Sequence, residues 1–247
     1  MGKSCSVSLK HRNNVEKAIE VYEMLRQGRP GSRQYLKNYL NIFLGINVPD
    51  KRICGGHNSP MDYLWHSFGC DFAAERGANA DCVVWANRGG GKTQLAAVAT
   101  LMDCVFKPNC QVRILGGSGE QAGRMYDYLA GFLRGGFEEF LSGPIRKGRC
   151  RFLNGSSVEV LTQSPMSVRG QHIQKLRCDE VELFDEDVFG AAKFTTQSTE
   201  NVMAAMETIS TMHRPYGLMQ RIVSSAERMG TPVFRWCLWE VIERCIG

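Results

Sequence analysis

The chain has 247 residues, of which 43% are hydrophobic and 22% charged, and its net charge is +5. This is the composition of a globular protein with one large α/β domain, or with one such domain and a small appendage. Because no run of about 18 apolar residues occurs and no signal-peptide core follows Met1, the sequence predicts an intracellular protein without a membrane span.

The N-terminal region, residues 1–57, is basic, with ten Lys or Arg residues against four Asp or Glu. Apolar residues at helical spacing predict one helix over residues 15–26 and a second over 34–44, with a Gly- and Pro-containing break between them. We expect a basic helical appendage. It could contact a polyanion or present a solvated face, and charge alone leaves both interpretations open.

From residue 58 the pattern changes to alternating strands and helices. Short apolar runs predict strands, and Asn154-Gly155 predicts a hairpin turn between two of them; the strands are 82–86, 111–115, 149–153, 157–162, 173–178 and 218–223. Helical patterns cover 92–105, 120–134, 186–193, 199–212 and 233–245. This alternation predicts one domain, 58–247, with a mostly parallel central sheet flanked by helices on both faces.

The ten cysteines are scattered along the chain and form no Cys-x-x-Cys pair. Several lie inside apolar runs, so we interpret them as buried reduced thiols. Cys237 and Cys245 could begin a metal site, but on their own they provide too few ligands, and no such site is predicted.

A glycine-rich stretch follows the first predicted strand of the domain. Its sequence, from Ala86 to Thr93, is Ala-Asn-Arg-Gly-Gly-Gly-Lys-Thr, which matches the phosphate-binding loop of P-loop NTPases with Ala in place of the first Gly. Glycines let backbone N–H groups turn toward phosphates, and the following helix directs its N-terminal dipole at the same anion. The predicted nucleotide contacts are Ala86, Asn87, Arg88, Gly89, Gly90, Gly91, Lys92 and Thr93.

Within this loop, Lys92 is predicted to neutralise the β- and γ-phosphates of ATP, and the Thr93 hydroxyl is predicted to bind Mg²⁺. The alternative is a glycine-rich turn that binds nothing. The apolar strand before the loop and the long helix after it favour the nucleotide site.

A pair of carboxylates, Asp179-Glu180, follows the strand predicted at 173–178. We predict that Asp179 holds Mg²⁺ together with Thr93 and that Glu180 polarises the attacking water. Lys175 and Arg177 interrupt the apolar pattern of this strand, which indicates that one of its faces is partly exposed. An acidic helix cap is the competing interpretation, and the other acidic candidates nearby are Glu182, Asp185 and Asp187.

Taken together, these motifs resemble the ATPase domain of the large terminase subunit, the motor that packages DNA into viral capsids. Four features carry the resemblance: Arg88 ahead of the glycines, Ser-Val-Arg169-Gly170 before the carboxylate strand, the pair Asp179-Glu180, and Ser224-Ser225-Ala226, placed at the end of a later predicted strand. It covers about residues 58–245.

The resemblance implies an α/β P-loop NTPase fold of the ASCE, RecA-like type with ATP and Mg²⁺ as cofactors. It further implies translocation of double-stranded DNA by a homo-oligomeric ring, usually a pentamer, on the portal protein, with the small terminase subunit as a partner, in the cytoplasm of the host cell. By the same analogy, Arg169 acts on ATP in the adjacent subunit, Arg88 senses the γ-phosphate, and Ser224, Ser225 and Ala226 couple hydrolysis to DNA movement. The residue-based alternatives are a surface arginine at 169 and an ordinary strand end at 224–226.

Two features depart from the family pattern. The segment 57–68 lies where the family often carries a glutamine-containing adenine motif, yet it has no Gln; Tyr63 or Trp65 could stack on adenine, although core packing is the more usual role for both. The chain also stops before the position of the family's C-terminal nuclease domain, so we expect that domain to be absent from this chain and expect no nuclease activity.

Two rival functions are weighed against a packaging motor. A RecA-like helicase would carry a second RecA-like half, for which this chain has neither the length nor a candidate motif. The second rival is a non-motor P-loop protein, such as a small-molecule kinase or a regulatory nucleotide-binding module. A kinase would need a substrate lid and usually lacks a Glu beside the Mg²⁺-binding Asp.

Overall fold

The computed structural model describes residues 5–72, 79–168, 172–211 and 215–243, and of 5–15 and Pro165 only the backbone. It divides into two units, Met1–Ile46 and Asn47–Gly247. The predicted boundary after residue 57 therefore falls too late: the backbone amides of Asp50 and Cys54 donate to the side chains of Glu243 and Glu240, which ties this segment into the second unit.

The first unit contains the two predicted helices, α1 (Cys5–Gln27) and α2 (Arg33–Leu44). Helix α2 begins at Ser32, whose side chain accepts a hydrogen bond from the amide of Tyr35, and it ends at Gly45, whose φ of 66° suits glycine. The Tyr39 hydroxyl donates to the carbonyl of Arg26 at 2.9 Å. The expected helical appendage is thus present.

The second unit is built on a seven-stranded sheet in the order β3-β4-β2-β5-β6-β1-β7. All neighbouring strands are parallel except β3 and β4, which form the hairpin predicted at Asn154-Gly155. The strands are β1 (Cys82–Ala86), β2 (Gln111–Gly116), β3 (Arg149–Arg151), β4 (Ser157–Leu161), β5 (Lys175–Asp179), β6 (Ala205–Ser210) and β7 (Val233–Trp236). The mostly parallel sheet is confirmed.

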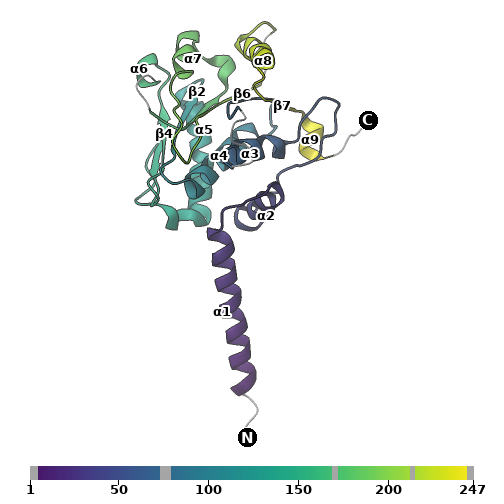
Figure 1. Ribbon diagram of the computed structural model, residues 1–247, viewed down its shortest axis with the longest axis vertical. Helices are drawn as coiled ribbons and strands as arrows, with labels where there is room; N and C mark the ends of the chain where they lie inside the picture. Colours follow the sequence, from purple (N-terminus) through teal and green to yellow (C-terminus); the bar gives the residue numbers. More distant parts are fainter. Residues whose placement is uncertain (1–4, 73–78, 169–171, 212–214, 244–247) are drawn as a thin grey trace. The chain divides into compact units, whose positions relative to one another are not determined.

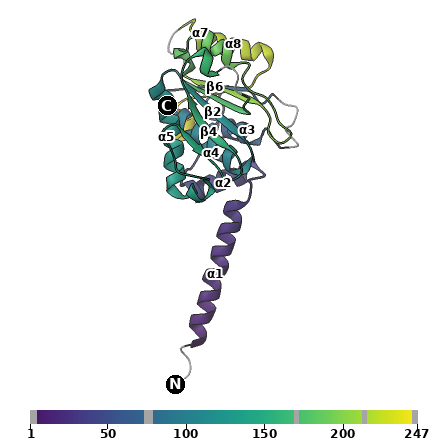
Figure 2. The same ribbon diagram turned by 90° about the vertical axis from the view of Figure 1, so that its left-hand side faces the viewer.

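Helices cover both faces of this sheet (Figures 1 and 2). One face carries α3 (Pro60–Gly69), α4 (Lys92–Phe106) and α5 (Gly119–Phe132), which is followed by a π-helical turn (Leu133–Phe137) and a 3-10 turn (Glu138–Phe140). The other carries α7 (Glu186–Ala192) and α8 (Leu218–Met229), with the short α6 (Pro165–Val168) beside α7 and a 3-10 turn (Val181–Leu183) beside α8; α9 (Leu238–Ile242) follows β7. No described helix is both long and apolar enough to cross a bilayer.

Two predicted elements have the wrong type. Residues 199–212, predicted as a helix, contain strand β6, which lies between β1 and β5 and is buried on both faces, so that no period-2 alternation is visible. Residues 218–223, predicted as a strand, begin helix α8, which Gly217 and Gly230 bound and which packs Met219, Val223 and Ala226 against Val83. The predicted C-terminal helix is in fact β7 followed by α9.

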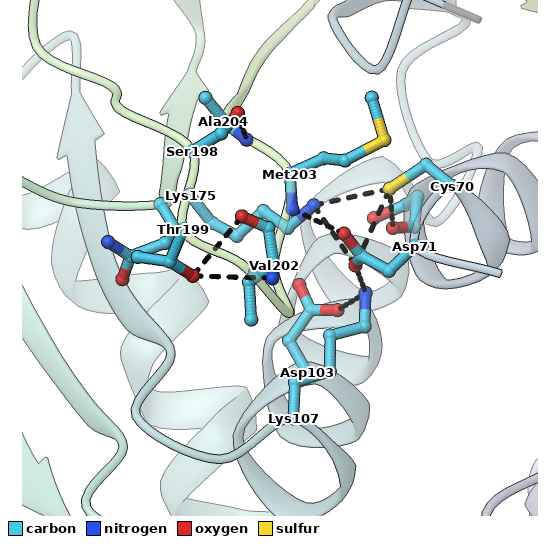
Figure 3. A network of polar contacts seen from close by, with 12 residues as sticks. Cys70, Asp71, Asp103, Lys107, Lys175, Ser198, Thr199, Val202, Met203 and Ala204 are labelled. Atoms are coloured by element: carbon cyan, nitrogen blue, oxygen red, sulfur yellow. Dashed lines mark hydrogen bonds and ion pairs between the residues drawn. The ribbon is translucent and has the colours of Figure 1, made fainter. Parts of the chain in front are cut away.

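Strand β5 also differs from its prediction, because neither of its faces is exposed. Lys175 and Arg177 are fully buried and lie in ion pairs on the side of α4. Lys175 donates to Cys70 and pairs with Asp71, which also pairs with Lys107, and Lys107 in turn pairs with Asp103 (Figure 3). Buried charges need such partners, and these come from segments distant in the sequence.

Candidate active site

The glycine-rich loop, residues 86–93, connects β1 to α4 and has the backbone of a loop that surrounds an anion. Gly89 and Gly91 both have φ of +75°, a conformation that side chains disfavour. At Gly90, a Cβ would lie 2.5 Å from the Asn87 side-chain oxygen, and the Gly90 carbonyl accepts a hydrogen bond from the buried indole of Trp236 at 2.8 Å. The three glycines are therefore each required, two by conformation and one by space.

Lys92, the first residue of α4, directs its ammonium group back into this loop. Its Nζ donates to the carbonyls of Ala86 and Asn87 at 3.3 and 3.0 Å and to the Thr211 hydroxyl at 2.7 Å. Burial lowers the pKa of Lys92, while the nearby carboxylates Glu180 and Asp179 oppose that shift. A buried ammonium held only by neutral oxygens is suited to an anionic ligand.

Thr93 and Asp179 meet across the gap between α4 and the end of β5. The Thr93 hydroxyl donates to the Asp179 carboxylate at 2.8 Å, although 86 residues separate them in the sequence. A hydroxyl and a carboxylate are oxygen donors that a hard cation such as Mg²⁺ prefers. The structure thus brings together the two residues predicted to hold the metal.

Asp179 is 1% exposed, and burial raises the pKa of its carboxyl group to about 6, with the Thr93 hydrogen bond acting in the opposite direction. Its oxygens accept hydrogen bonds from the Thr93 hydroxyl and the Glu180 amide, and it forms no ion pair with any described residue. A buried carboxylate with so little compensation favours an added cation.

Glu180 follows directly, in a left-handed backbone conformation with φ of 54°. The Ser210 hydroxyl lies 3.5 Å from the Glu180 carboxylate. A strained backbone at such a position is typical of functional sites.

The other acidic residues considered for the metal or the catalytic base include two that hydrogen-bond backbone amides at the starts of helices. The Glu182 carboxylate accepts a hydrogen bond from the Met219 amide, at the start of α8, at 2.7 Å. The Asp185 side chain caps α7 by accepting from the Asp187 amide at 2.8 Å, and Asp187 is exposed on that helix. The helix-cap interpretation therefore applies to Glu182 and Asp185 rather than to Asp179 and Glu180.

Ser210 and Thr211 belong to the site, and the sequence interpretation missed them. Strand β6 ends at Ser210 between β1 and β5, so these two hydroxyls lie between the glycine-rich loop and the carboxylate pair. The run Thr208-Ile209-Ser210-Thr211, rich in β-branched residues before small polar ones, was the available signal.

Ser224, Ser225 and Ala226 do not lie at a strand end, contrary to the prediction. All three are inside helix α8, where the Ser225 hydroxyl contacts the sulfur of Met229 and Ala226 packs into the hydrophobic cluster under that helix. The placement failed because Leu218–Val223 was interpreted as a strand.

The remaining predicted residues have mixed outcomes. Arg88 is exposed on the glycine-rich loop. Arg169 lies outside the described residues. Tyr63 is fully buried and donates to Glu207, and Trp65 stacks on Phe72, so both aromatic side chains are used in packing.

A cavity of about 230 Å³ adjoins the first residues of the glycine-rich loop. Its lining comes from the segment before α3 and from β1, β7 and the residues that follow β1, β6 and β7: His57, Trp85, Ala86, Asn87, Thr211, Arg235, Trp236 and Cys237. Because it shares Ala86, Asn87 and Thr211 with the surroundings of Lys92, it extends the same site away from the carboxylates.

Solved structures with this arrangement of strands and helices include several phage proteins. The large terminase of bacteriophage HK97 matches with a TM-score of 0.61 and 17% identity, over 83% of this chain and 43% of that one. The fold is that of a large terminase ATPase domain.

Two further structures agree. The large terminase of a thermophilic bacteriophage, solved in complex with ADP, matches with a TM-score of 0.53 and 12% identity, over 69% of this chain and 44% of that one. The Thermus phage P74-26 large terminase ATPase domain matches with a TM-score of 0.52 and 17% identity, over 74% of this chain and 88% of that one. The resemblance found in the sequence is confirmed at the level of the fold.

This chain spans less than half the length of the HK97 terminase and of the ADP-bound terminase that it matches. No protein-family model and no curated protein sequence matches it.

Proposed function

We propose that this chain is the ATP-hydrolysing motor domain of a large terminase subunit, which drives double-stranded DNA into a viral capsid. The observation that carries the proposal is the contact between Thr93 and Asp179 at 2.8 Å, beside a lysine whose ammonium points into a glycine-rich loop. The terminase ATPase fold and the ADP-bound terminase from the thermophilic phage support it.

In the proposed site, the amides after Ala86 and the ammonium of Lys92 bind the triphosphate. Thr93 and Asp179 hold Mg²⁺, which when bound supplies positive charge next to the phosphate oxygens. Glu180, beside Ser210, accepts the proton of the attacking water.

Ser210 and Thr211 take the coupling role that the resemblance implied for residues 224–226. The Thr211 hydroxyl already contacts Lys92, and Ser210 contacts both the Glu180 carboxylate and the amide of Glu182. A change in the phosphate group next to Lys92 can therefore be transmitted through the two hydroxyls to the 3-10 turn that precedes α7 and packs beside α8. The cavity beside Ala86 and Asn87 receives the nucleoside part of ATP.

The partners follow from the proposed motor role: double-stranded DNA, a homo-oligomeric ring on a portal protein, and a small terminase subunit, in the host cytoplasm. The basic first unit is proposed to contact DNA or the small subunit. A RecA-like helicase is the alternative, and strand separation on a forked duplex, compared with displacement of a triplex strand from an intact duplex, discriminates between the two.

The direct test of the active site is Glu180→Gln, measured as ATP turnover and as ATP binding. We expect turnover to fall by about two orders of magnitude or more, because the water loses its base, while ATP still binds. Asp187→Asn, on the exposed face of α7, is the matched control and should retain turnover. Turnover near the original rate in Glu180→Gln would show that another carboxylate is the base.

Arg169 is proposed to act on ATP in a neighbouring subunit, in keeping with the resemblance. Arg169→Ala alone should lose turnover, and mixing it with Glu180→Gln should restore part of it, because one variant keeps the base and the other keeps the arginine. Absence of rescue in mixtures that still co-assemble would count against a role between subunits.

A further inference from the structure

Four metal-ligating side chains meet at one point outside the catalytic constellation, and all four belong to the second unit. They are Cys54, His57, Cys237 and Glu240, and their ligand atoms all lie within 4.8 Å of one another. The six other cysteines whose side chains the structure describes are each buried and form no such group with histidine. This cluster is therefore a distinct feature of the fold.

The local backbone brings each pair of side chains together. Cys54 and His57 flank Gly55-Gly56 in a tight turn, closed by a hydrogen bond from the His57 amide to the Cys54 carbonyl at 3.2 Å, with Gly56 at φ +76°. Cys237 directly precedes α9 as its N-cap residue, and Glu240 is three residues further. Both pairs have two intervening residues, the short ligand spacing that is typical of zinc sites.

The distances also fit a tetrahedral ion. The two thiol sulfurs lie 3.7 Å apart. Two sulfurs bound to one Zn²⁺ at about 2.3 Å each, in tetrahedral geometry, lie about 3.8 Å apart. A disulfide would need about 2.05 Å, so the two sulfurs are not bonded, and their separation is compatible with two ligands of one ion.

The His57 ring nitrogen Nδ1 and the Glu240 carboxylate Oε2 lie 3.0 Å apart, close to the separation of about 3.4 Å expected for two ligands of one Zn²⁺. A metal ion would take the place of the proton that these two atoms share. Backbone amides already orient the carboxylate: Cys54 donates to it at 2.7 Å and Cys237 at 2.8 Å. Such donors around the ligands are usual at metal sites.

We propose that Cys54, His57, Cys237 and Glu240 bind a structural Zn²⁺ ion that fastens the segment before α3 to the start of α9. Two sulfurs, one imidazole nitrogen and one carboxylate oxygen form a donor set that Zn²⁺ accepts and that Mg²⁺ or Ca²⁺ does not. Binding displaces the two thiol protons into solvent and holds His57 in the tautomer that carries its proton on Nε2, so affinity increases with pH.

This site adjoins the nucleotide pocket. His57 and Cys237 line the same cavity as Ala86 and Asn87, and the Asn87 amide contacts the Trp236 carbonyl immediately before Cys237. The ion would therefore fix one wall of that cavity. This consequence for ATP binding rests on the proposed function, whereas the presence of the ion does not.

The first experiment measures metal in the full chain, purified without an affinity tag, by inductively coupled plasma mass spectrometry. We expect about one Zn²⁺ per chain. After removal of the metal and addition of Co²⁺ under reducing conditions, we expect the visible absorption of tetrahedral cobalt and the near-ultraviolet charge transfer of thiolate ligands. Absence of zinc together with absence of this cobalt spectrum would overturn the proposal.

The second experiment compares variants with a matched control. Cys54→Ser and Cys237→Ser should each lose at least tenfold in zinc affinity, whereas Cys150→Ser, at a buried thiol remote from the cluster, should retain full zinc content. Glu240→Gln should also lower the zinc affinity, and it should change the visible spectrum of bound Co²⁺. Zinc retained at full affinity in Cys54→Ser or in Cys237→Ser would overturn the assignment.

A redox pair is the competing outcome. Thiol titration and intact mass under non-reducing conditions detect it, because a Cys54–Cys237 disulfide removes two free thiols and two hydrogens without binding metal. A Cys54–Cys237 disulfide without metal in freshly isolated protein would overturn the zinc proposal in favour of a redox pair. Failure of ATP hydrolysis in a chain that contains zinc would count against the proposed function and leave the metal site intact.

Discussion

The buried charged residues of strand β5 differ in their partners: those toward its start are paired with opposite charges, and the one at its end is not. Lys175, Arg177 and Asp179 alternate along one face of this strand, toward α4, and all three are buried. Arg177 lies between two carboxylates, with nitrogen–oxygen distances of 2.6 Å to Asp103 and 3.1 Å to Glu207. Asp179, four residues from Lys175, has a hydroxyl and an amide as partners instead.

The pKa values follow this difference. Burial acts against the ionised form of Asp103, yet Lys107 and Arg177 more than offset it and lower the pKa of its carboxyl group to about 2. At Asp179 burial prevails and raises the pKa to about 6. A buried charge that its neighbours compensate holds the fold together, whereas one that they leave uncompensated is available for a ligand.

The largest effect is expected at the compensated end. Arg177→Met removes the cation paired with Glu207 and one of the two cations paired with Asp103, which should lower the free energy of unfolding by about 3–5 kcal/mol. Urea denaturation followed by circular dichroism measures it. Arg221→Met, which breaks only the exposed pair with Glu186, is the matched control and should have little effect. Equal losses in the two variants would show that the buried pairs of Arg177 contribute no more than an exposed ion pair.

Asp179→Asn tests the uncompensated end. The folded pKa of Asp179 lies above that of an unfolded carboxyl group, so at pH values above about 6 the ionised side chain destabilises the fold. Removing that charge should leave the free energy of unfolding unchanged or raise it by about 1 kcal/mol. ATP turnover should nevertheless fall by about 100-fold or more, because the cation loses its carboxylate. Clear destabilisation in this variant would contradict the comparison.

The glycine-rich loop was predictable from the sequence because its eight residues act locally. The glycines, Lys92 and Thr93 all lie in one continuous segment. The strand that precedes them, β1, lies at Cys82–Ala86, as predicted. Asp179 was predictable for a different reason: the carboxyl ends of parallel strands meet at one edge of the sheet.

The charge network was not predictable, because its members meet only in the folded chain. The polar residues of β5 suggested an exposed face, but Asp71 and Asp103 come from segments about seventy or more residues earlier. Strand β6 was missed for a related reason: Glu207 in its centre is buried with hydrogen bonds from Arg177, Tyr63 and Ser67, all from other segments. Helix α8, by contrast, could have been recognised from the helical spacing of its apolar residues between Gly217 and Gly230.

Lys175→Met should have a smaller effect than Arg177→Met. Lys175 donates to Cys70 and lies 3.6 Å from Asp71, but Asp71 keeps its closer pair with Lys107 at 2.5 Å. We expect the free energy of unfolding to fall by about 1–2 kcal/mol, with ATP turnover nearly unchanged. The same denaturation and turnover assays measure both. A loss as large as that of Arg177→Met would mean that Lys107 does not compensate Asp71 alone.

The smallest effect is expected for Thr93→Ser, which keeps the hydroxyl that donates to Asp179 and removes one methyl group. Turnover and the Mg²⁺ dependence of ATP hydrolysis should stay within about threefold of the original, because the oxygen donor is what the site requires. Thr93→Val keeps the shape and removes the hydroxyl, so it should raise the Mg²⁺ concentration needed for half-maximal turnover by about tenfold or more. If Ser and Val behaved alike, Thr93 would contribute packing rather than a ligand, and Asp179 would have to hold the cation with a different partner.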